Sequence, residues 1–247
     1  MKKILTDMYV GGRWWPTENT FADINPSNDA LWAEVPDVGI DETQSAINAA
    51  NHACEQWADL PFNQRAHFMI KIAEIFEKRK MDIVSALQGE AGGWFGKGMF
   101  EASYVPEIFY AAAAMNYAPI GEVIPSEFGK LSMAIRRPIG VVSVISPWNF
   151  PTLLTARGIA FALSAGNTVV LKPSEETPYC GGLLFAEIFE EAGIPGGVLN
   201  VITCSRDNVS AVGEEMVEHP LVKGISFTGS TAVGRGIAAR AGAHLKK

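Results

Sequence analysis

An asparagine that follows an apolar run is the first residue in this sequence with the means to do chemistry. The segment Val141–Pro151 reads VVSVISPWNFP, and its apolar first part is typical of a buried strand that ends at Pro147. Open α/β sheets bind ligands beside the carboxyl ends of their strands. There, the side-chain amide of Asn149 could donate to an oxygen that gains negative charge. Alternatively, Asn149 caps the helix that Pro151 can start, and the residue type alone favours this cap.

A second candidate pair follows the next apolar run. Lys172 and Glu175 come directly after Val169–Leu171, in the order LKPSE. At the carboxyl end of a strand, the carboxylate can accept from ribose hydroxyls while the ammonium group donates to the same edge. The other interpretation is a solvated turn with a surface ion pair, and the spacing alone favours it.

A third candidate is the turn before the last predicted helix. Phe227 ends a short strand, Gly229 permits a tight turn, Ser230 begins the helix, and Gly234 follows one turn later. Backbone N–H groups at such a helix start can receive a pyrophosphate. The pattern is not GxGxxG, and a helix capped by Ser230 would explain the same residues.

The cysteines and histidines favour structural roles. Three cysteines stand at scattered positions, which argues against a disulfide framework and for a reducing compartment, so we expect a cytoplasmic protein. Cys54 lies on a predicted helix and is expected to be a small core residue. His52 and His67 have no cysteine or carboxylate at metal-ligand spacing, so no metal site is predicted.

Three segments resemble, in the right order, motifs of the aldehyde dehydrogenase superfamily. They are SPWNFP, NTVVLKPSEETP and ISFTGSTAVGR. The resemblance runs from about Tyr9 to the end of the sequence. The region GEAGGWFGKGMFEASYVPEIF is similar to the benzaldehyde and salicylaldehyde branch, which indicates an aromatic aldehyde as substrate.

The resemblance implies roles for particular positions. Asn149 corresponds to the oxyanion donor of the family, and Lys172 with Glu175 to the pair that holds the adenosine ribose. A carboxylate at this position resembles users of NAD more than strict users of NADP, because it would repel a 2′-phosphate. Ser230 matches the residue that touches the pyrophosphate. The other cofactor-binding positions implied are Ile145, Ser146, Pro147, Trp148, Phe227, Gly229 and Val233.

The family's chemistry also needs two groups that its motifs place later in the chain. A cysteine thiolate attacks the aldehyde, hydride passes to NAD(P), and a glutamate activates the water that releases the carboxylic acid. Cys180 lies on a helix that the family packs behind the cofactor sheet, and Cys204 stands where the family often has glycine. The resemblance therefore implies an N-terminal fragment of an NAD(P)-dependent aldehyde dehydrogenase, truncated before the catalytic domain and inactive alone.

Two other classes of protein stay open at this point. One is a non-catalytic nucleotide-binding or assembly module that ends at Lys247. The other is an unrelated Rossmann dehydrogenase, although the early GxGxxG expected of it is absent. Reading the gene beyond Lys247 would separate the first of these from the enzyme.

Composition limits the partners. The 247 residues are 48% hydrophobic and 19% charged, with a net charge of −7 and no basic stripe, so nucleic acid is not expected as a partner. Residues 138–156 carry no charge and reach the length of a membrane span. Prolines, a glycine and an asparagine interrupt this run, so we expect a buried strand, loop and helix and no membrane contact.

The element pattern predicts an α/β fold similar to that of aldehyde dehydrogenases. Residues 1–118 are expected to hold a meander and a helical layer, with one helix opened by Asp41 and a capping box that uses Gln44. Residues 119–138 are expected to form a bridging hairpin, which the resemblance links to homo-oligomer assembly. From 139 to 247 strands and helices alternate, which predicts a Rossmann-type parallel sheet.

Overall fold

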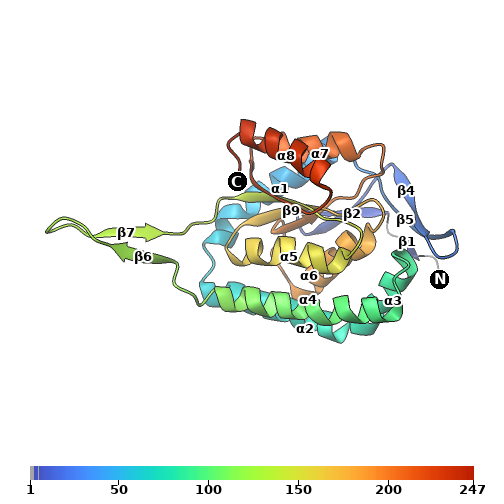
Figure 1. Ribbon diagram of the computed structural model, residues 1–247, viewed down its shortest axis with the longest axis horizontal. Helices are drawn as coiled ribbons and strands as arrows, with labels where there is room; N and C mark the ends of the chain where they lie inside the picture. The colour runs from blue at the N-terminus through green and yellow to red at the C-terminus, as the bar shows by residue number, and fades with distance from the viewer. Residues whose placement is uncertain (1–2, 5) are drawn as a thin grey trace.

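The computed structural model describes residues 3–4 and 6–247, and a mixed β-sheet lies at its centre (Figure 1). Within these residues the sheet has six strands, four of them parallel and two, from the N-terminal segment, antiparallel at one edge. The predicted parallel sheet is therefore confirmed. In spatial order the strands are β11 (Val222–Phe227), β8 (Val141–Ile145), β9 (Thr168–Lys172), β10 (Leu199–Val201), β2 (Asp7–Val10) and β3 (Arg13–Pro16).

The register of the parallel strands aligns three strand ends. Ile145 of β8 pairs with Phe227 of β11 on one side and with Lys172 of β9 on the other. Because parallel strands end at the same edge of a sheet, the loops that follow these three residues emerge side by side. This register brings Ile145 next to Lys172, 27 positions away, and next to Phe227, 82 positions away.

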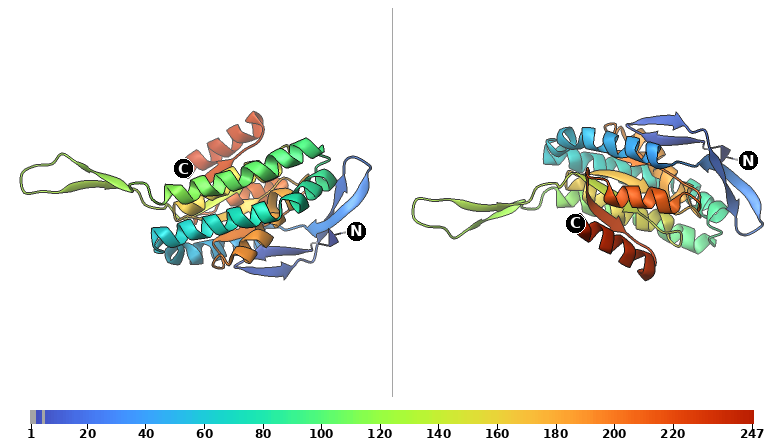
Figure 2. Two further views of the ribbon diagram at one scale, coloured as in Figure 1. Left: turned by 90° about the horizontal axis from the view of Figure 1, so that it is seen from below. Right: turned by 90° about the horizontal axis from the view of Figure 1, so that it is seen from above.

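Helices cover both faces of the sheet, as Figures 1 and 2 show. On one face α5 and α6 pack against the strands, and α2, α3 and α4 form an outer layer beyond them. On the other face lie α1, α7 and α8. The helices span α1 Ile40–Ala58, α2 Phe62–Lys78, α3 Lys80–Glu90, α4 Phe95–Met115, α5 Pro151–Ser164, α6 Leu184–Ala192, α7 Val209–Glu218 and α8 Thr231–Ala243.

Aromatic rings fill the space between the outer helices and α6. The ring centroids of Phe76 and Phe109 lie 5.6 Å apart, and Phe76 lies 5.4 Å from Phe185. All three side chains are fully buried, and rings at these separations add to the hydrophobic contribution of their area. The indole of Trp57 donates to the carbonyl of Leu163 at 2.9 Å, so this buried polar group is satisfied.

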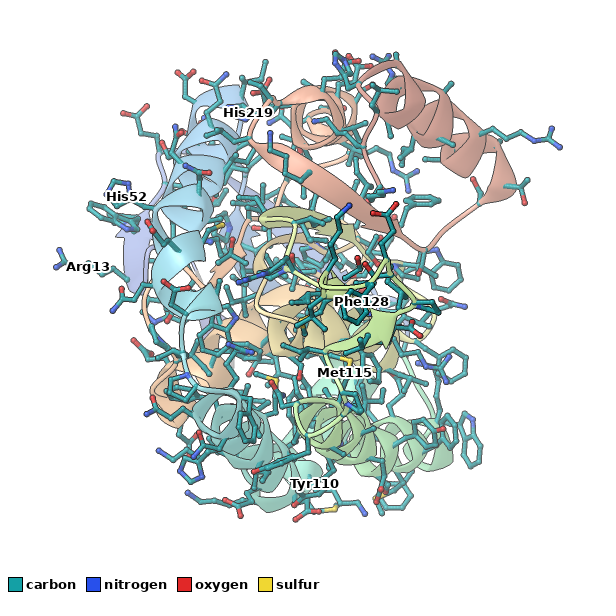
Figure 3. All side chains as sticks on the ribbon, turned by 90° about the vertical axis from the view of Figure 1, so that its left-hand side faces the viewer. Arg13, His52, Tyr110, Met115, Phe128 and His219 are labelled. Carbon is teal, nitrogen blue, oxygen red and sulfur yellow. The ribbon has the colours of Figure 1, made fainter. Side chains whose placement is uncertain are left out.

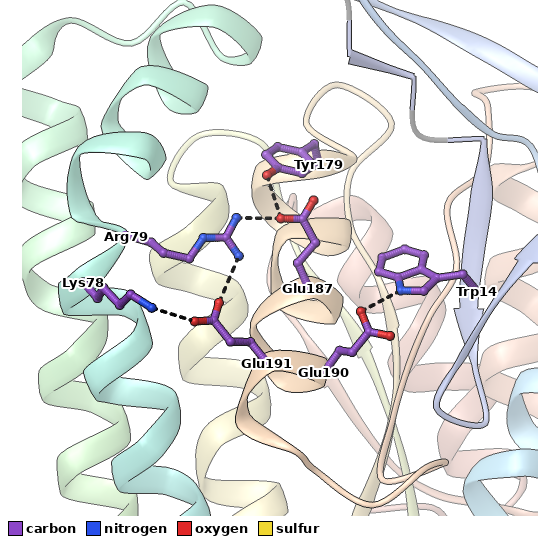
Figure 4. Close-up of polar contacts among 7 residues, drawn as sticks. All are labelled: Trp14, Lys78, Arg79, Tyr179, Glu187, Glu190 and Glu191. Atoms are coloured by element: carbon purple, nitrogen blue, oxygen red, sulfur yellow. Dashed lines mark hydrogen bonds and ion pairs between the residues drawn. The ribbon is translucent and has the colours of Figure 1, made fainter.

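Ion pairs and hydrogen bonds tie α6 to its neighbours on two sides (Figure 4). Glu187 accepts from Arg79 at the end of α2, at 2.6 Å, and from the hydroxyl of Tyr179, at 3.2 Å. On the other side, the indole of Trp14 in β3 donates to Glu190 at 3.0 Å. The Arg79–Glu187 pair is mostly buried, so solvent screens it less than an exposed pair. These contacts fix α6 between the outer helices and the N-terminal edge of the sheet.

The N-terminal meander divides between two sheets. Strands β2 and β3 join the central sheet, while β4 (Thr20–Asn25) pairs with β5 (Ala30–Pro36), which also pairs with β1 (Lys3–Ile4). The predicted capping box of the next helix is wrong in its details. Glu42 accepts from the backbone N–H of Gly39 at 2.9 Å, so the helix starts one residue before Asp41. Gln44 instead donates to Glu215 of α7 at 3.1 Å.

The predicted bridging hairpin projects away from the body of the molecule (Figures 1 and 2). Strand β6 (Gly121–Ile124) pairs with β7 (Ser132–Ile135), so two antiparallel strands form within residues 119–138. Figure 3 looks onto the tip, where Phe128 points into solvent. Val123 and Met133 lie opposite each other on one face, and both are more than half exposed.

The uncharged run of residues 138–156 forms β8, a loop and the start of α5, as predicted. Its strand is buried between β9 and β11, which explains its apolar character. Among residues 3–4 and 6–247, none of the helices combines the length and the apolar character that crossing a membrane requires.

The helical segment that follows β9 begins as a π-helical turn, η1 (Tyr179–Leu183), and continues as α6. Two glycines explain how this turn fits. A Cβ on Gly182 would lie 2.6 Å from Cγ of Pro173, and one on Gly181 3.1 Å from Cβ of Pro173. The turn therefore packs directly against the loop that follows β9.

A glutamate from another helix caps the start of α5. Residue Phe150 occupies the N-cap position and supplies no side-chain cap. Instead, a carboxylate oxygen of Glu101 in α4 accepts from the backbone N–H of Leu153 at 3.2 Å, and the other oxygen accepts from Lys97 at 2.8 Å. Glu101 is fully buried, and a negative charge at a helix N-terminus is stabilised by the helix dipole. This cap holds the end of the Asn149 loop.

A second buried carboxylate caps η1 and shares a proton with a neighbour. Glu90, at the end of α3, accepts from the backbone N–H groups of Tyr179 at 2.5 Å and Cys180 at 2.7 Å. It also hydrogen-bonds Asp23 of β4. Burial, and then the Glu90 charge, raise the pKa of Asp23 to about 9, so Asp23 is the protonated partner and donates. Burial also raises the pKa of Glu90.

We expect Glu101→Ala to lower the free energy of unfolding by about 1–3 kcal/mol, because the buried N–H of Leu153 loses its acceptor. Urea denaturation measures this change. The matched control is Glu107→Ala, an exposed glutamate on the same helix, which should change stability by less than about 0.5 kcal/mol. Equal effects of the two substitutions would contradict a capping role for Glu101.

The Asp23–Glu90 pair also predicts a pH dependence of stability. Because the pKa of Asp23 is about 9 in the folded chain and 3.8 when unperturbed, the folded state binds more protons between these values. The contribution of Asp23 to stability should therefore be complete below about pH 4 and be lost as the pH rises towards 9.

Asp23→Asn should remove most of this decline, because an amide can donate to Glu90 at every pH. Urea midpoints between pH 5 and pH 9 would measure the slope for the native chain and the variant. Glu55→Gln, at an exposed position on α1, is the control and should keep the native slope. If the urea midpoint of Asp23→Asn falls with pH as steeply as that of the native chain, Asp23 and Glu90 do not share a proton.

Candidate functional site

A cleft of about 370 Å³ opens at the aligned ends of β11, β8 and β9. Helices α7 and α8 form its other walls. Its volume and mainly apolar lining are typical of small-molecule sites in proteins. Five of the residues predicted to bind a cofactor line it together: Ile145, Lys172, Glu175, Phe227 and Val233.

Lys172 and Glu175 both reach this cleft but do not pair with each other. Lys172 is buried, and its ammonium group donates to the carbonyl of Pro173 at 2.6 Å. One oxygen of Glu175 lies 3.3 Å from the guanidinium of Arg206, and Ser174 donates to the other at 3.4 Å. The alternative of a solvated turn is therefore wrong for Lys172, which is buried, whereas an ion pair does form at Glu175, with Arg206 as its partner. The carboxylate remains at the edge of the cleft, where it can accept further hydrogen bonds.

The turn at Phe227 combines a packing role with a helix start. A Cβ on Gly229 would lie 2.5 Å from the Phe227 ring, so only glycine allows the ring to pack over this turn. Ser230 is the N-cap of α8 and accepts from the backbone N–H of Val233 at 3.3 Å. The capping interpretation of Ser230 is thus confirmed. The first residues of α8, including Val233, are exposed to solvent.

Asn149 is exposed in the loop after β8, and its side chain makes no hydrogen bond with any residue that the structure describes. The N-cap of α5 is Phe150, with Pro151 at the first helical position. The interpretation of Asn149 as a helix cap is therefore wrong. Its amide is free to donate to a molecule beside the loop.

The other predicted positions of this loop divide between the interior and the surface. Ser146 is buried, accepts from the hydroxyl of Thr155 at 2.7 Å, and its backbone N–H donates to the carbonyl of Lys172 at 3.1 Å. Pro147 is half-buried and Trp148 is 61% exposed. Trp148 lines a neighbouring hollow of about 510 Å³, whose wall also contains Glu175 and Arg206. Residues 146–150 do not line the 370 Å³ cleft itself, and Trp148 borders only the neighbouring hollow. The bonds of Ser146 fix the start of this loop against the sheet and α5.

Aromatic side chains next to Asn149 form a cluster that sequence reasoning missed. We call Phe100, Tyr104 and Phe150 the aromatic cluster. The rings of Phe100 and Tyr104 stack at 5.8 Å, and Phe100 meets Phe150 edge-on at 6.3 Å. The guanidinium of Arg157 lies 5.9 Å from the Tyr104 ring centroid. The sequence did carry a signal for this cluster. Phe100 and Tyr104 lie outside the helix face that contains Val105 and Ile108, and large aromatic side chains outside the buried face of a helix indicate a contact surface.

None of the three cysteines has the character of a nucleophile. Cys180 is fully buried, and burial together with the charges of Glu90 and Glu101 raises its thiol pKa well above the usual value. Burial also raises the pKa values of Cys54 and Cys204. A thiolate, the reactive form, is therefore disfavoured at each position. In the described part of the chain, no group of three or more His, Cys, Asp or Glu side chains could hold a metal ion.

The sequence matches the family described as "Aldehyde dehydrogenase family" over residues 14–247. It is 40% identical over 225 residues to benzaldehyde dehydrogenase [NAD(+)] of Pseudomonas putida, covering 91% of this chain and 45% of that protein. It is 38% identical over 236 residues to the mitochondrial succinate-semialdehyde dehydrogenase of Rattus norvegicus, covering 93% and 44%.

Solved structures give the same assignment. An NAD-dependent benzaldehyde dehydrogenase from Corynebacterium glutamicum superposes with a TM-score of 0.90 at 37% identity, covering 96% of this chain and 50% of that one. An NADP-dependent enzyme from E. coli gives a TM-score of 0.94 at 34% identity, covering 98% and 50%.

The chain spans about half the length of the curated relatives it matches. The interpretation as an unrelated Rossmann dehydrogenase is wrong, because the family match covers nearly the whole chain. The strand order, the aligned strand ends and the three ordered segments agree with this match. The chain belongs to the aldehyde dehydrogenase family.

Proposed function

We propose that this chain binds NAD in the 370 Å³ cleft and contributes Asn149 to the oxidation of an aldehyde to its carboxylic acid. The single observation that carries the proposal is the free amide of Asn149. It follows directly after a buried strand whose last residue, Ile145, lines the cleft. An exposed amide without a structural partner is available for a ligand.

The residues of the cleft suit a dinucleotide. Glu175 would accept from the adenosine ribose, with the Lys172 ammonium group on the same edge. The exposed N-terminus of α8 at Ser230 would receive the pyrophosphate. Gly229 has no Cβ, which lets the Phe227 ring pack closely against this turn. When bound, the nicotinamide ring accepts the hydride from the substrate.

Asn149 would act on the oxygen of the aldehyde carbonyl. Attack by a nucleophile places negative charge on this oxygen, and a pre-positioned donor stabilises that charge more than it stabilises the neutral carbonyl. The Glu101 cap at Leu153 and the Thr155–Ser146 bond hold the backbone of the loop at both ends, so the residue that carries the amide has a fixed place in the chain. The raised pKa values of Cys54, Cys180 and Cys204 argue against each of them as the nucleophile.

We propose NAD as the preferred cofactor, with NADP second. The similar solved structures include an NAD-dependent and an NADP-dependent enzyme, so the family alone leaves the choice open. The argument for NAD is the carboxylate of Glu175 at the cleft's edge, because it would repel a 2′-phosphate.

We propose an aromatic aldehyde as the substrate. Relatives named as benzaldehyde and vanillin dehydrogenases support this choice. The aromatic cluster offers rings next to Asn149, against which the ring of a substrate could pack. Higher kcat/KM for short aliphatic aldehydes than for benzaldehyde would contradict this part of the proposal.

We also propose that residues 119–138 form an assembly element between the two parts of a nucleotide-binding domain, 1–118 and 139–247. The hairpin buries little within its own chain, and its apolar side chains face solvent. An exposed apolar strand pair of this kind is a surface for another subunit. The proposed assembly is a homo-oligomer in the cytoplasm, where the three free thiols would stay reduced.

Asn149→Ala should lower kcat by about 10²–10³ in the active enzyme that carries this chain, as removal of other oxyanion donors does. NAD affinity should be nearly unchanged, because the amide acts on the substrate oxygen. Asn149→Asp, which keeps the volume but removes the donor, should be at least as slow. Turnover of benzaldehyde equal to that of the native enzyme, with a deuterated aldehyde showing that hydride transfer limits the rate, would exclude the role of Asn149.

Val123→Glu with Met133→Glu should reduce the assembly to a smaller species in sedimentation velocity, because charges would replace the apolar face of the hairpin. Ser132→Glu, on the opposite face of the same hairpin, is the matched control and should leave the assembly intact. A native protein that sediments as a monomer would rule out the assembly role.

A further inference from the structure

Arg206 lines the proposed cofactor cleft but has no role yet in binding the cofactor. It lies in the loop between β10 and α7, and it lines both the 370 Å³ cleft and the hollow beside Trp148. Its guanidinium lies 3.3 Å from a carboxylate oxygen of Glu175 and 2.8 Å from one of Glu176. One cation is thus shared by two adjacent carboxylates at the edge where the ribose would bind.

The backbone around Arg206 is held, while its side chain is exposed. Asp37 accepts from the backbone N–H of Ser205 at 2.7 Å and from the side-chain amide of Asn208 at 3.0 Å. These bonds fix the loop on both sides of Arg206. The Arg206 side chain is 76% exposed, so its guanidinium can turn without disturbing the loop.

The shared cation changes the electrostatic argument for NAD. Glu175 alone would repel a phosphate on the ribose, and a guanidinium 3.3 Å away opposes that repulsion, although solvent screens it because Arg206 is exposed. Glu176 gives Arg206 a second partner, so the cation can release Glu175 without losing all its ion pairs. A guanidinium presents several N–H donors in one plane, which suits a phosphate group.

We propose that Arg206 is the residue that sets cofactor choice at the ribose 2′ position. This inference rests on the proposed cofactor cleft. With an unphosphorylated ribose, Arg206 stays on Glu176 and Glu175 accepts from the hydroxyls. With a 2′-phosphate, Arg206 turns from Glu175 to the phosphate, so the chain accepts NADP as a second cofactor.

The cleft contains a matched arginine that separates this role from a general effect of charge. Arg240 of α8 lines the same cleft and also bridges two carboxylates, those of Glu214 and Glu218 of α7. Neither of its partners is the proposed ribose acceptor. Substitution of Arg240 removes the same charge from the same cleft but leaves the ion pair of Glu175 intact. Any loosening of α8 would change the affinity for both probes together, so the ratio of the two affinities still reports the 2′ position.

The experiment compares two probes that differ only in the 2′-phosphate, 5′-AMP and adenosine 2′,5′-bisphosphate. Isothermal titration gives the dissociation constant of each for the native chain, Arg206→Gln, Arg240→Gln and Glu175→Gln. Circular dichroism checks that each variant is folded. The ratio of the two constants reports discrimination at the 2′ position and is independent of any later step in catalysis.

Arg206→Gln should move this ratio against the bisphosphate by about tenfold, which corresponds to about 1.4 kcal/mol. Glu175→Gln should move it in the opposite direction, and Arg240→Gln should leave it near the native value. Added salt should bring the ratio measured for the native chain closer to the ratio measured for Arg206→Gln, because ions screen an exposed charge.

Three outcomes would overturn the inference. If Arg206→Gln keeps the native ratio while 5′-AMP binds, Arg206 has no role in cofactor choice and the proposed cleft stands. If Arg240→Gln shifts the ratio as much as Arg206→Gln, the effect is only one of net charge. If the native chain binds neither probe, the cofactor cleft itself is wrong, and the role of Arg206 is refuted with it.

Discussion

The parallel pairing of β8 with its two neighbours is the constraint on which the site depends. Because Ile145 pairs with both Phe227 and Lys172, three loops leave the sheet at one edge. A shift of the register by one residue would turn the buried side chains of β8 towards the opposite face. The strand is buried on both faces, so such a shift would bury the loop's polar groups and is strongly disfavoured.

Two buried carboxylates then determine how the loops after these strands are held. Glu101 caps α5 beyond the Asn149 loop, and Glu90 caps η1 beyond the Glu175 loop. The outer helices α3 and α4 therefore do more than cover the apolar face of α5. Each supplies a charge to a helix start whose own N-cap residue, Phe150 or Pro178, supplies no side-chain cap.

Sequence reasoning predicted the order of strands and helices because each β-α unit carries its own pattern of apolar residues. It also predicted the residues at strand ends, such as Lys172 and Phe227, because parallel strands end at one edge. It did not predict the caps, since Glu101 and Leu153 are separated by 52 positions and Glu90 and Tyr179 by 89. Such a glutamate differs from a surface glutamate only by lying on a buried helix face, which the pattern of charges does not reveal.

The two walls of the cleft are supported to different degrees. The wall made by β8 and β9 belongs to the buried core, whereas α8 buries only Ala241 among its side chains in the described chain. What joins α8 to α7 includes the exposed ion pairs of Arg240 with Glu214 and Glu218. Exposed pairs contribute little and weaken with salt. The position of the α8 wall, and with it the helix start at Ser230, is therefore the least constrained part of a site whose strand side is rigid.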